Sequence, residues 1–135
     1  MAFYFLDSNS PNPGDDAGFL SLSEQNKLKQ YLSEQHRNIV VVHHHPIAVS
    51  TPIIDHYIMK NGDTLTQHQN IDMILVGHVH GDYTVQHDNF TLESGIATCL
   101  QWEKGAREIA FDLRFGYTEY LFTPTHYQKR VHWIN

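Results

Sequence analysis

The sequence contains a single cysteine, Cys99, among 135 residues, which excludes a framework of internal disulfides. A lone thiol is typical of proteins in a reducing compartment, so we expect a cytoplasmic location. The chain also lacks an apolar run of the roughly 18 residues that are needed to span a bilayer. Its start, residues 1–6, has neither the basic nor the apolar region of a signal peptide. The sequence therefore predicts no association with a membrane.

Positive charge is scarce as well. Nine Lys and Arg stand against fifteen Asp and Glu, which gives a net charge of −6 with neutral histidines. Without a basic stripe, nucleic acid is not an expected partner. The hydrophobic share of 41% and the charged share of 18% are ordinary for a globular chain of this length. We therefore expect one domain, residues 1–135, with a buried core.

Histidine, in contrast, is abundant, with eleven in the chain. Two groups stand out, His43-His44-His45-Pro46 and Gly77-His78-Val79-His80-Gly81. Each follows a short aliphatic run, and such runs are typical of buried strands. Open α/β sheets bind their ligands at the carboxyl ends of strands, and neutral imidazole is the commonest metal ligand in proteins. The two groups therefore predict a metal site.

Periodicity and turn residues predict an α/β fold with the order β-α-β-α-β, followed by antiparallel strands. The first part has strands at 2–6, 39–42 and 71–76, a helix at about 23–35 and a short helix at 63–69. Ser21 and Glu24 form a capping box before the longer helix. Loops are expected at 7–18 and 48–59. The later strands are expected at 83–87, 90–92, 109–115, 117–122 and 127–134, with turns at Asp88-Asn89 and Gly116.

The spacing within each group suggests which histidines are ligands. Residues at i and i+2 of a strand share a face, so His78 and His80 can reach one metal or two adjacent metals. The same alternation turns the middle of three adjacent histidines away. His43 is then the expected ligand, and His44 or His45 is expected to contact the substrate or to support the ligands from behind. Polar loop histidines that merely lie close together are the alternative for either group.

Other residues are weaker candidates. Asp55 and His56 fit either a substrate-side loop or an ordinary solvated one. Cys99 is expected to be a small core residue in a strand. The four histidines without a partner pattern are expected to be surface or core polar residues: His68, His87, His126 and His132.

The sequence resembles the calcineurin-like metallophosphoesterases, and within them the bacterial class III cyclic-nucleotide phosphodiesterases. The resemblance covers Leu6-Asp7-Ser8, Gly18-Phe19-Leu20, Val42 to Pro46, Asp55 to Asn61, Val76 to His80 and Ala97 to Gln101. It implies an α/β sandwich and a two-metal centre of manganese, iron or zinc that hydrolyses a small phosphodiester such as cAMP. It also implies that His43 and His78 bind one metal and His80 the other.

The sequence departs from this family in its metal-binding motifs. The chain lacks the family's Asp-x-His and Gly-Asn-His motifs, and with them the Gly-Asp that the family places between these two. We therefore expect the C-terminal half of the sandwich, with no complete set of catalytic residues. Without a bridging carboxylate two close cations repel each other, so one metal or none is expected. Exposed strand edges predict a homo-oligomer. The alternative is a non-catalytic truncated product that binds metal weakly or serves as an oligomerising module.

Overall fold

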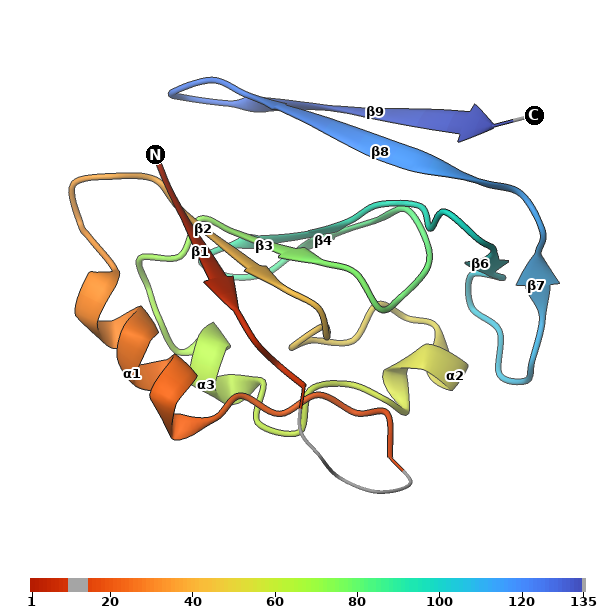
Figure 1. The fold of residues 1–135 in the computed structure, drawn as a ribbon, viewed down its shortest axis with the longest axis horizontal. Coiled ribbons are helices and arrows are strands. Elements are labelled where there is room, and N and C mark those ends of the chain that lie inside the picture. Colours follow the sequence, from red (N-terminus) through yellow and green to blue (C-terminus); the bar gives the residue numbers. More distant parts are fainter. Residues whose placement is uncertain (10–14, 135) are drawn as a thin grey trace.

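The computed structural model describes residues 1–9 and 15–134. Its centre is a five-stranded sheet with the order β1-β2-β3-β5-β4 (Figure 1). Four strands run parallel: β1 (Ala2–Leu6), β2 (Asn38–Val42), β3 (Met73–Val76) and β5 (Thr91–Ser94). The edge strand β4 (Tyr83–Gln86) is antiparallel to β5. The α/β fold predicted from the sequence is confirmed at this level.

The helices lie along one face of the sheet (Figure 1). They are α1 (Leu22–Tyr31), α2 (Pro52–Asp55) and α3 (Asp63–Thr66). The core forms between them and the sheet, because β2 and β3 are aliphatic on both faces and can bury a full face against the helices. Its members include Val40, Val42, Ile74, Val76 and Leu92 from the strands and Leu28, Ile54 and Leu65 from the helices. This packing fixes the strand ends that carry the histidines.

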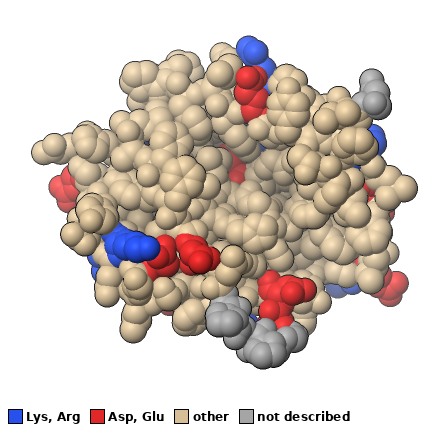
Figure 2. All heavy atoms as spheres, in the orientation of Figure 1, with Lys and Arg blue, Asp and Glu red and all other residues tan. Residues whose placement is uncertain are grey.

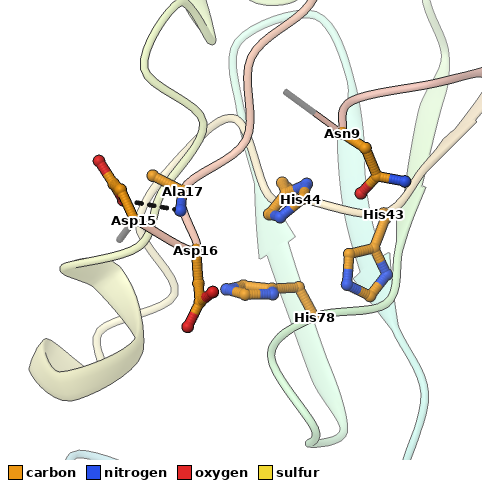
Figure 3. A pocket seen from close by; sticks show the side chains of 7 residues that line it. All are labelled: Asn9, Asp15, Asp16, Ala17, His43, His44 and His78. Atoms are coloured by element: carbon orange, nitrogen blue, oxygen red, sulfur yellow. Dashed lines mark hydrogen bonds between the residues drawn. The ribbon is translucent and has the colours of Figure 1, made fainter. Parts of the chain in front are cut away.

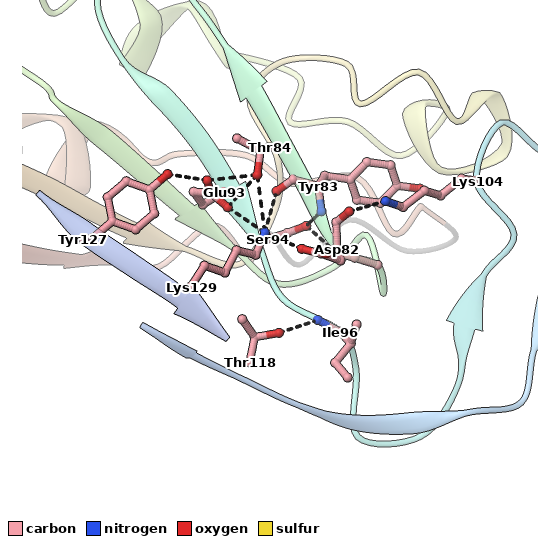
Figure 4. A network of polar contacts seen from close by, with 11 residues as sticks. Asp82, Tyr83, Thr84, Glu93, Ser94, Ile96, Lys104, Thr118, Tyr127 and Lys129 are labelled. Carbon is pink, nitrogen blue, oxygen red and sulfur yellow. Dashed lines mark hydrogen bonds and ion pairs between the residues drawn. The ribbon is translucent and has the colours of Figure 1, made fainter. Parts of the chain in front are cut away.

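The other face of the sheet is crossed by a long hairpin of β8 (Phe115–Phe122) and β9 (Tyr127–Ile134) (Figure 1). A short pair, β6 (Gln101–Trp102) and β7 (Phe111–Asp112), precedes it. Phe122 packs edge-on against Phe3 of β1, with ring centroids 5.3 Å apart. Glu93 of β5 accepts hydrogen bonds from Tyr127 and Lys129 of β9 (Figure 4). The hairpin is thus fastened to the sheet at the edge strand β1 and at β5.

Several predicted boundaries were wrong. The first helix ends at Tyr31 instead of near Gln35, because the backbone of Leu32 turns to an extended conformation. A strand runs through Gly116, where a turn was expected. A Cβ at that position would lie 2.0 Å from the carbonyl oxygen of His132, so glycine is needed here for close pairing with β9. Cys99 is exposed and lies outside the strands, so it is not a core residue.

The remaining predictions of this kind were close. The side chain of Ser21 accepts from the backbone N–H of Glu24 at 3.2 Å, which confirms the N-cap half of the expected capping box. The Glu24 carboxylate accepts from the backbone N–H of Asp7 instead. The expected loop at 48–59 contains the single turn of α2. No helix in residues 1–9 and 15–134 is long and apolar enough to cross a membrane. On the face seen in Figure 2, the Lys and Arg side chains are few and scattered.

Candidate metal centre

The two histidine groups meet because β2 and β3 are parallel neighbours. Val42 pairs with Val76 at the carboxyl ends of the two strands, so the residues that follow leave the sheet side by side. The backbone N–H of Gly77 then donates to the carbonyl oxygen of His43 at 3.0 Å. This bond ties the two loops together immediately beyond the sheet.

Three imidazoles gather at this point: His43, His44 and His78. Each offers one ring nitrogen, and these three atoms all lie within 4.8 Å of one another. Their ring centroids are 4.6 to 5.3 Å apart. The rings line a hollow of about 360 Å³ together with Asn9 and Asp16 (Figure 3). Nitrogen ligands in this arrangement can hold a transition metal ion.

The electrostatics of the cluster favour neutral rings. Burial, with the neighbouring histidines acting in the same direction, lowers the pKa of His78 to about 3. Burial also lowers the pKa of His43 and of His44, although Asp16 acts in the opposite direction on His44. A neutral imidazole keeps the nitrogen lone pair that a metal requires. The cluster is therefore ready to bind a cation at neutral pH.

His78 carries a buried ring nitrogen that the protein does not satisfy. Its Nε2 atom has no hydrogen-bond partner among the described residues. A buried polar atom without a partner costs about 1–3 kcal/mol. An ion bound at the cluster would remove this cost, so the donor set fits a metal.

Ser8 and Gly18 fix the position of His44. The hydroxyl of Ser8 lies 2.8 Å from Nδ1 of His44 and accepts the backbone N–H of His44 at 3.2 Å. Gly18 lies against the same ring, and a Cβ there would be 2.4 Å from Cβ of His44. With Nδ1 held by Ser8, Nε2 is the ring nitrogen through which His44 can bind an ion, in competition with the backbone of Asp16, which also bonds this imidazole. Spacing alone could not identify these two supports, although both lie in segments that resemble the phosphodiesterases.

The predicted site residues have different places in the structure. His44, expected near the substrate, lies in the cluster beside His43. Strand alternation fails here because the chain bends directly after Val42, so these two rings do not point to opposite faces. His45 is fully buried. Its Nε2 lies 3.3 Å from Oδ1 of Asp55, and its ring stacks on that of His78 with centroids 5.8 Å apart.

His80 is not one of the three clustered imidazoles. Its backbone adopts the left-handed conformation, with φ of 39°, so the chain from His78 to His80 is a turn and the i, i+2 rule for strands does not apply. Its Nδ1 lies 3.7 Å from Sγ of Cys99. The structure therefore joins His80 to an exposed thiol, a neighbour that the sequence did not predict.

Comparison with known proteins agrees with the motifs. The chain is 27% identical to a probable cyclic nucleotide phosphodiesterase of Coxiella burnetii, over 98% of the chain and 56% of that protein. It is 28% identical to one of Xenorhabdus bovienii, over 82% of the chain and 47% of that protein. With the 3',5'-cyclic adenosine monophosphate phosphodiesterase CpdA of Vibrio vulnificus the identity is 27% over 70% of the chain and 37% of the relative.

The matches cover only part of each relative. The chain spans about half the length of the first two relatives, 56% and 47%. No protein-family model matches it. The predicted resemblance is nonetheless confirmed: the chain is homologous to bacterial hydrolases named cyclic nucleotide phosphodiesterases.

Proposed function

We propose that this chain binds one divalent transition metal through His43, His44 and His78 and acts on a small phosphodiester of the cyclic-nucleotide class. The observation that carries the proposal is the cluster of three imidazoles, with the buried Nε2 of His78 unpartnered among the described residues. The names of the relatives support the substrate class. Imidazole nitrogen suits zinc, iron and manganese.

The residues of the chain have distinct tasks in this proposal. Ser8 orients His44 by its hydrogen bond to Nδ1. His45, close to Asp55, packs behind His78 and restricts its ring. A bound divalent ion would lower the pKa of water and neutralise charge on the phosphoryl oxygens.

The proposal includes one ion per chain. His80 remains the predicted ligand of a second ion, but residues 1–9 and 15–134 offer one group of three or more donor side chains, the cluster without His80. Two cations close together need negative charge between them to offset their repulsion. The hollow supplies the exposed carboxylate of Asp16, which in Figure 3 is turned toward the ring of His78.

Metal counting and calorimetry test this function. We expect about one Mn²⁺ or Zn²⁺ per chain, and an affinity at least about ten-fold lower in His44→Ala and in His78→Ala, since each change removes a ligand. His87→Ala is the matched control, because His87 stacks on Phe90 away from the cluster. Nearly two ions per chain, together with hydrolysis of an aryl phosphodiester, would refute the one-ion proposal. Unchanged affinity in both variants would refute the ligand set.

We also propose that the sheet is the C-terminal part of a metallophosphoesterase sandwich and that the protein works in the cytoplasm. The partial coverage of the relatives supports the first point, and the single cysteine supports the second. A second candidate function is a non-catalytic oligomerising module. It is favoured by the edge strand β1, on which Phe3 and Phe5 are 42% and 74% exposed. A chain that oligomerises but binds no metal would decide for this alternative.

A further inference from the structure

A second hollow, of about 320 Å³, lies beside Gly81 at the end of the histidine turn. Both of the chain's two tryptophans, Trp102 and Trp133, line it, and Ile96 adds apolar surface. Pockets for small molecules commonly enclose about 300 Å³ or more and are lined mainly by aromatic and apolar groups. The size and the lining of this hollow suit a flat aromatic ring.

Both indoles are held in place by neighbours. The ring of Trp102 packs on Phe111 with centroids 4.6 Å apart. The guanidinium of Arg114 lies over the ring of Trp133, 4.5 Å from its centroid. The two tryptophans come from different strand pairs, β6-β7 and β8-β9, so the hollow is formed where these pairs meet. A ligand would find the two rings already positioned, which reduces the entropy lost on binding.

The charges around the hollow do not favour a phosphate. Among the residues that line it, three carboxylates stand against two cations: Asp82, Glu103 and Asp112 against Lys104 and Arg114. Both cations are engaged, since Arg114 donates to the carboxylate of Asp112 and Lys104 to the backbone oxygen of Asp82. An anion here would meet more negative than positive charge. A neutral aromatic ring would not be repelled by these carboxylates.

The hollow is connected to the metal cluster through one turn. The backbone N–H of Trp102 donates to the carbonyl oxygen of His80 at 3.0 Å, and His80 follows His78 by two residues. Gly81, the next residue, forms part of the wall. One ligand with an anionic end and a flat aromatic end could therefore reach both places.

We propose that Trp102 and Trp133 bind the base of a nucleotide whose phosphate lies at the His43-His44-His78 cluster. This assignment rests on the proposed function and adds a specificity site to it. Bases stack readily on aromatic side chains, and such stacking tolerates different bases because each has a π-face. Adenosine and its 5'-monophosphate are the probes of choice, since relatives are named cyclic adenosine monophosphate phosphodiesterases.

The two tryptophans also provide the measurement, because the fluorescence of this chain excited selectively at tryptophan comes from the hollow alone. We expect adenosine to quench it saturably with or without Mn²⁺. In Trp133→Leu, the affinity for adenosine 5'-monophosphate should fall about ten-fold, as expected for one lost stacking partner. The affinity of the Mn²⁺-loaded chain for inorganic phosphate should not change. Tyr117→Leu is the matched control, a half-exposed aromatic of β8 outside the hollow.

The outcomes separate this proposal from the proposed function. If adenosine causes no quenching, or if Trp133→Leu binds adenosine 5'-monophosphate like the parent chain, the base site is refuted. If adenosine quenches but neither Mn²⁺ nor phosphate binds, the metal function fails and the base site stands. Trp133→Phe keeps a ring at the site and should retain most of the affinity. An equal loss in the Phe and Leu variants would overturn the stacking argument.

Discussion

Replacing Lys129 by methionine should destabilise the fold strongly, because the buried carboxylate of Glu93 then has no cation to pair with. Glu93 is 1% exposed and lies between β5 and the β8-β9 hairpin. Its carboxylate accepts from Nζ of Lys129 at 2.7 Å and from the hydroxyls of Thr84 and Tyr127 at 3.0 and 2.5 Å (Figure 4). In Lys129→Met the hydroxyls remain and the cation is lost.

The expected loss is a large part of the total stability. Breaking a buried ion pair by removing one partner costs about 3–5 kcal/mol. The side chain of Lys129 is 15% exposed, so some water reaches the pair and we take the lower end, about 3 kcal/mol. A small domain has a free energy of unfolding of about 5–15 kcal/mol in total.

Urea unfolding followed by circular dichroism measures this loss, with Lys27→Met as the matched control. Lys27 pairs with Glu24 on α1, but its side chain is 58% exposed, so its removal should cost less than about 1 kcal/mol. Lys129→Met combined with Glu93→Leu should recover part of the loss, because no charge is then left buried. A single Lys129→Met variant within about 1 kcal/mol of the parent would refute the reasoning.

Three further outcomes are expected. Gly18→Ala places a Cβ 2.4 Å from that of His44, so the Mn²⁺ affinity measured by calorimetry should fall about ten-fold; unchanged affinity would show that His44 is not a ligand. Phe5→Lys adds charge to the exposed edge of β1 and should convert an oligomer to a monomer in light scattering, whereas a monomeric parent chain would contradict the predicted assembly. Burial lowers the pKa of His78 to about 3, below its unfolded value of about 6.5. The unfolded chain therefore binds the extra proton, and between pH 6.5 and 3 the metal-free protein should lose about 1 kcal/mol of stability per unit of falling pH from this group; an unfolding midpoint in urea that is equal at pH 7 and pH 5 would count against it.

The parts of the fold that the sequence predicted well are those in which one physical term dominates. The aliphatic runs before His43 and before Gly77 are stable only when buried on both faces, as in a parallel strand. The residues that follow two such neighbouring strands lie at the same edge of the sheet. The hydroxyl of Ser21 likewise has a local partner only three residues away. In these cases short-range pattern and tertiary packing agree.

The parts that it missed depend on contacts between distant residues. His44 enters the cluster because Ser8, 36 positions earlier, bonds its ring and its backbone. Gly116 stays in a strand because the carbonyl of His132 approaches it closely. Neither contact can be inferred from the neighbouring residues in the sequence. Their pattern predicted an extended segment for the three histidines and a turn at Gly116. Turn residues and alternation are reliable only until a partner strand or loop overrides them.

Strand β5 joins the two candidate sites through adjacent side chains. Glu93 binds Lys129 on the hairpin side, while the hydroxyl of Ser94 donates to the carbonyl of Gly81 at 2.5 Å and so holds the end of the histidine turn. Successive residues of a strand point to opposite faces, so one short strand fastens both elements. Trp133 depends on the hairpin, whereas the histidines depend on the turn. The folded Lys129→Met variant should therefore bind adenosine with lower affinity, as measured by fluorescence quenching. Its affinity for Mn²⁺ should equal that of the parent chain. Equal weakening of both would mean that the hairpin also supports the metal cluster, and that the two sites are not fastened separately.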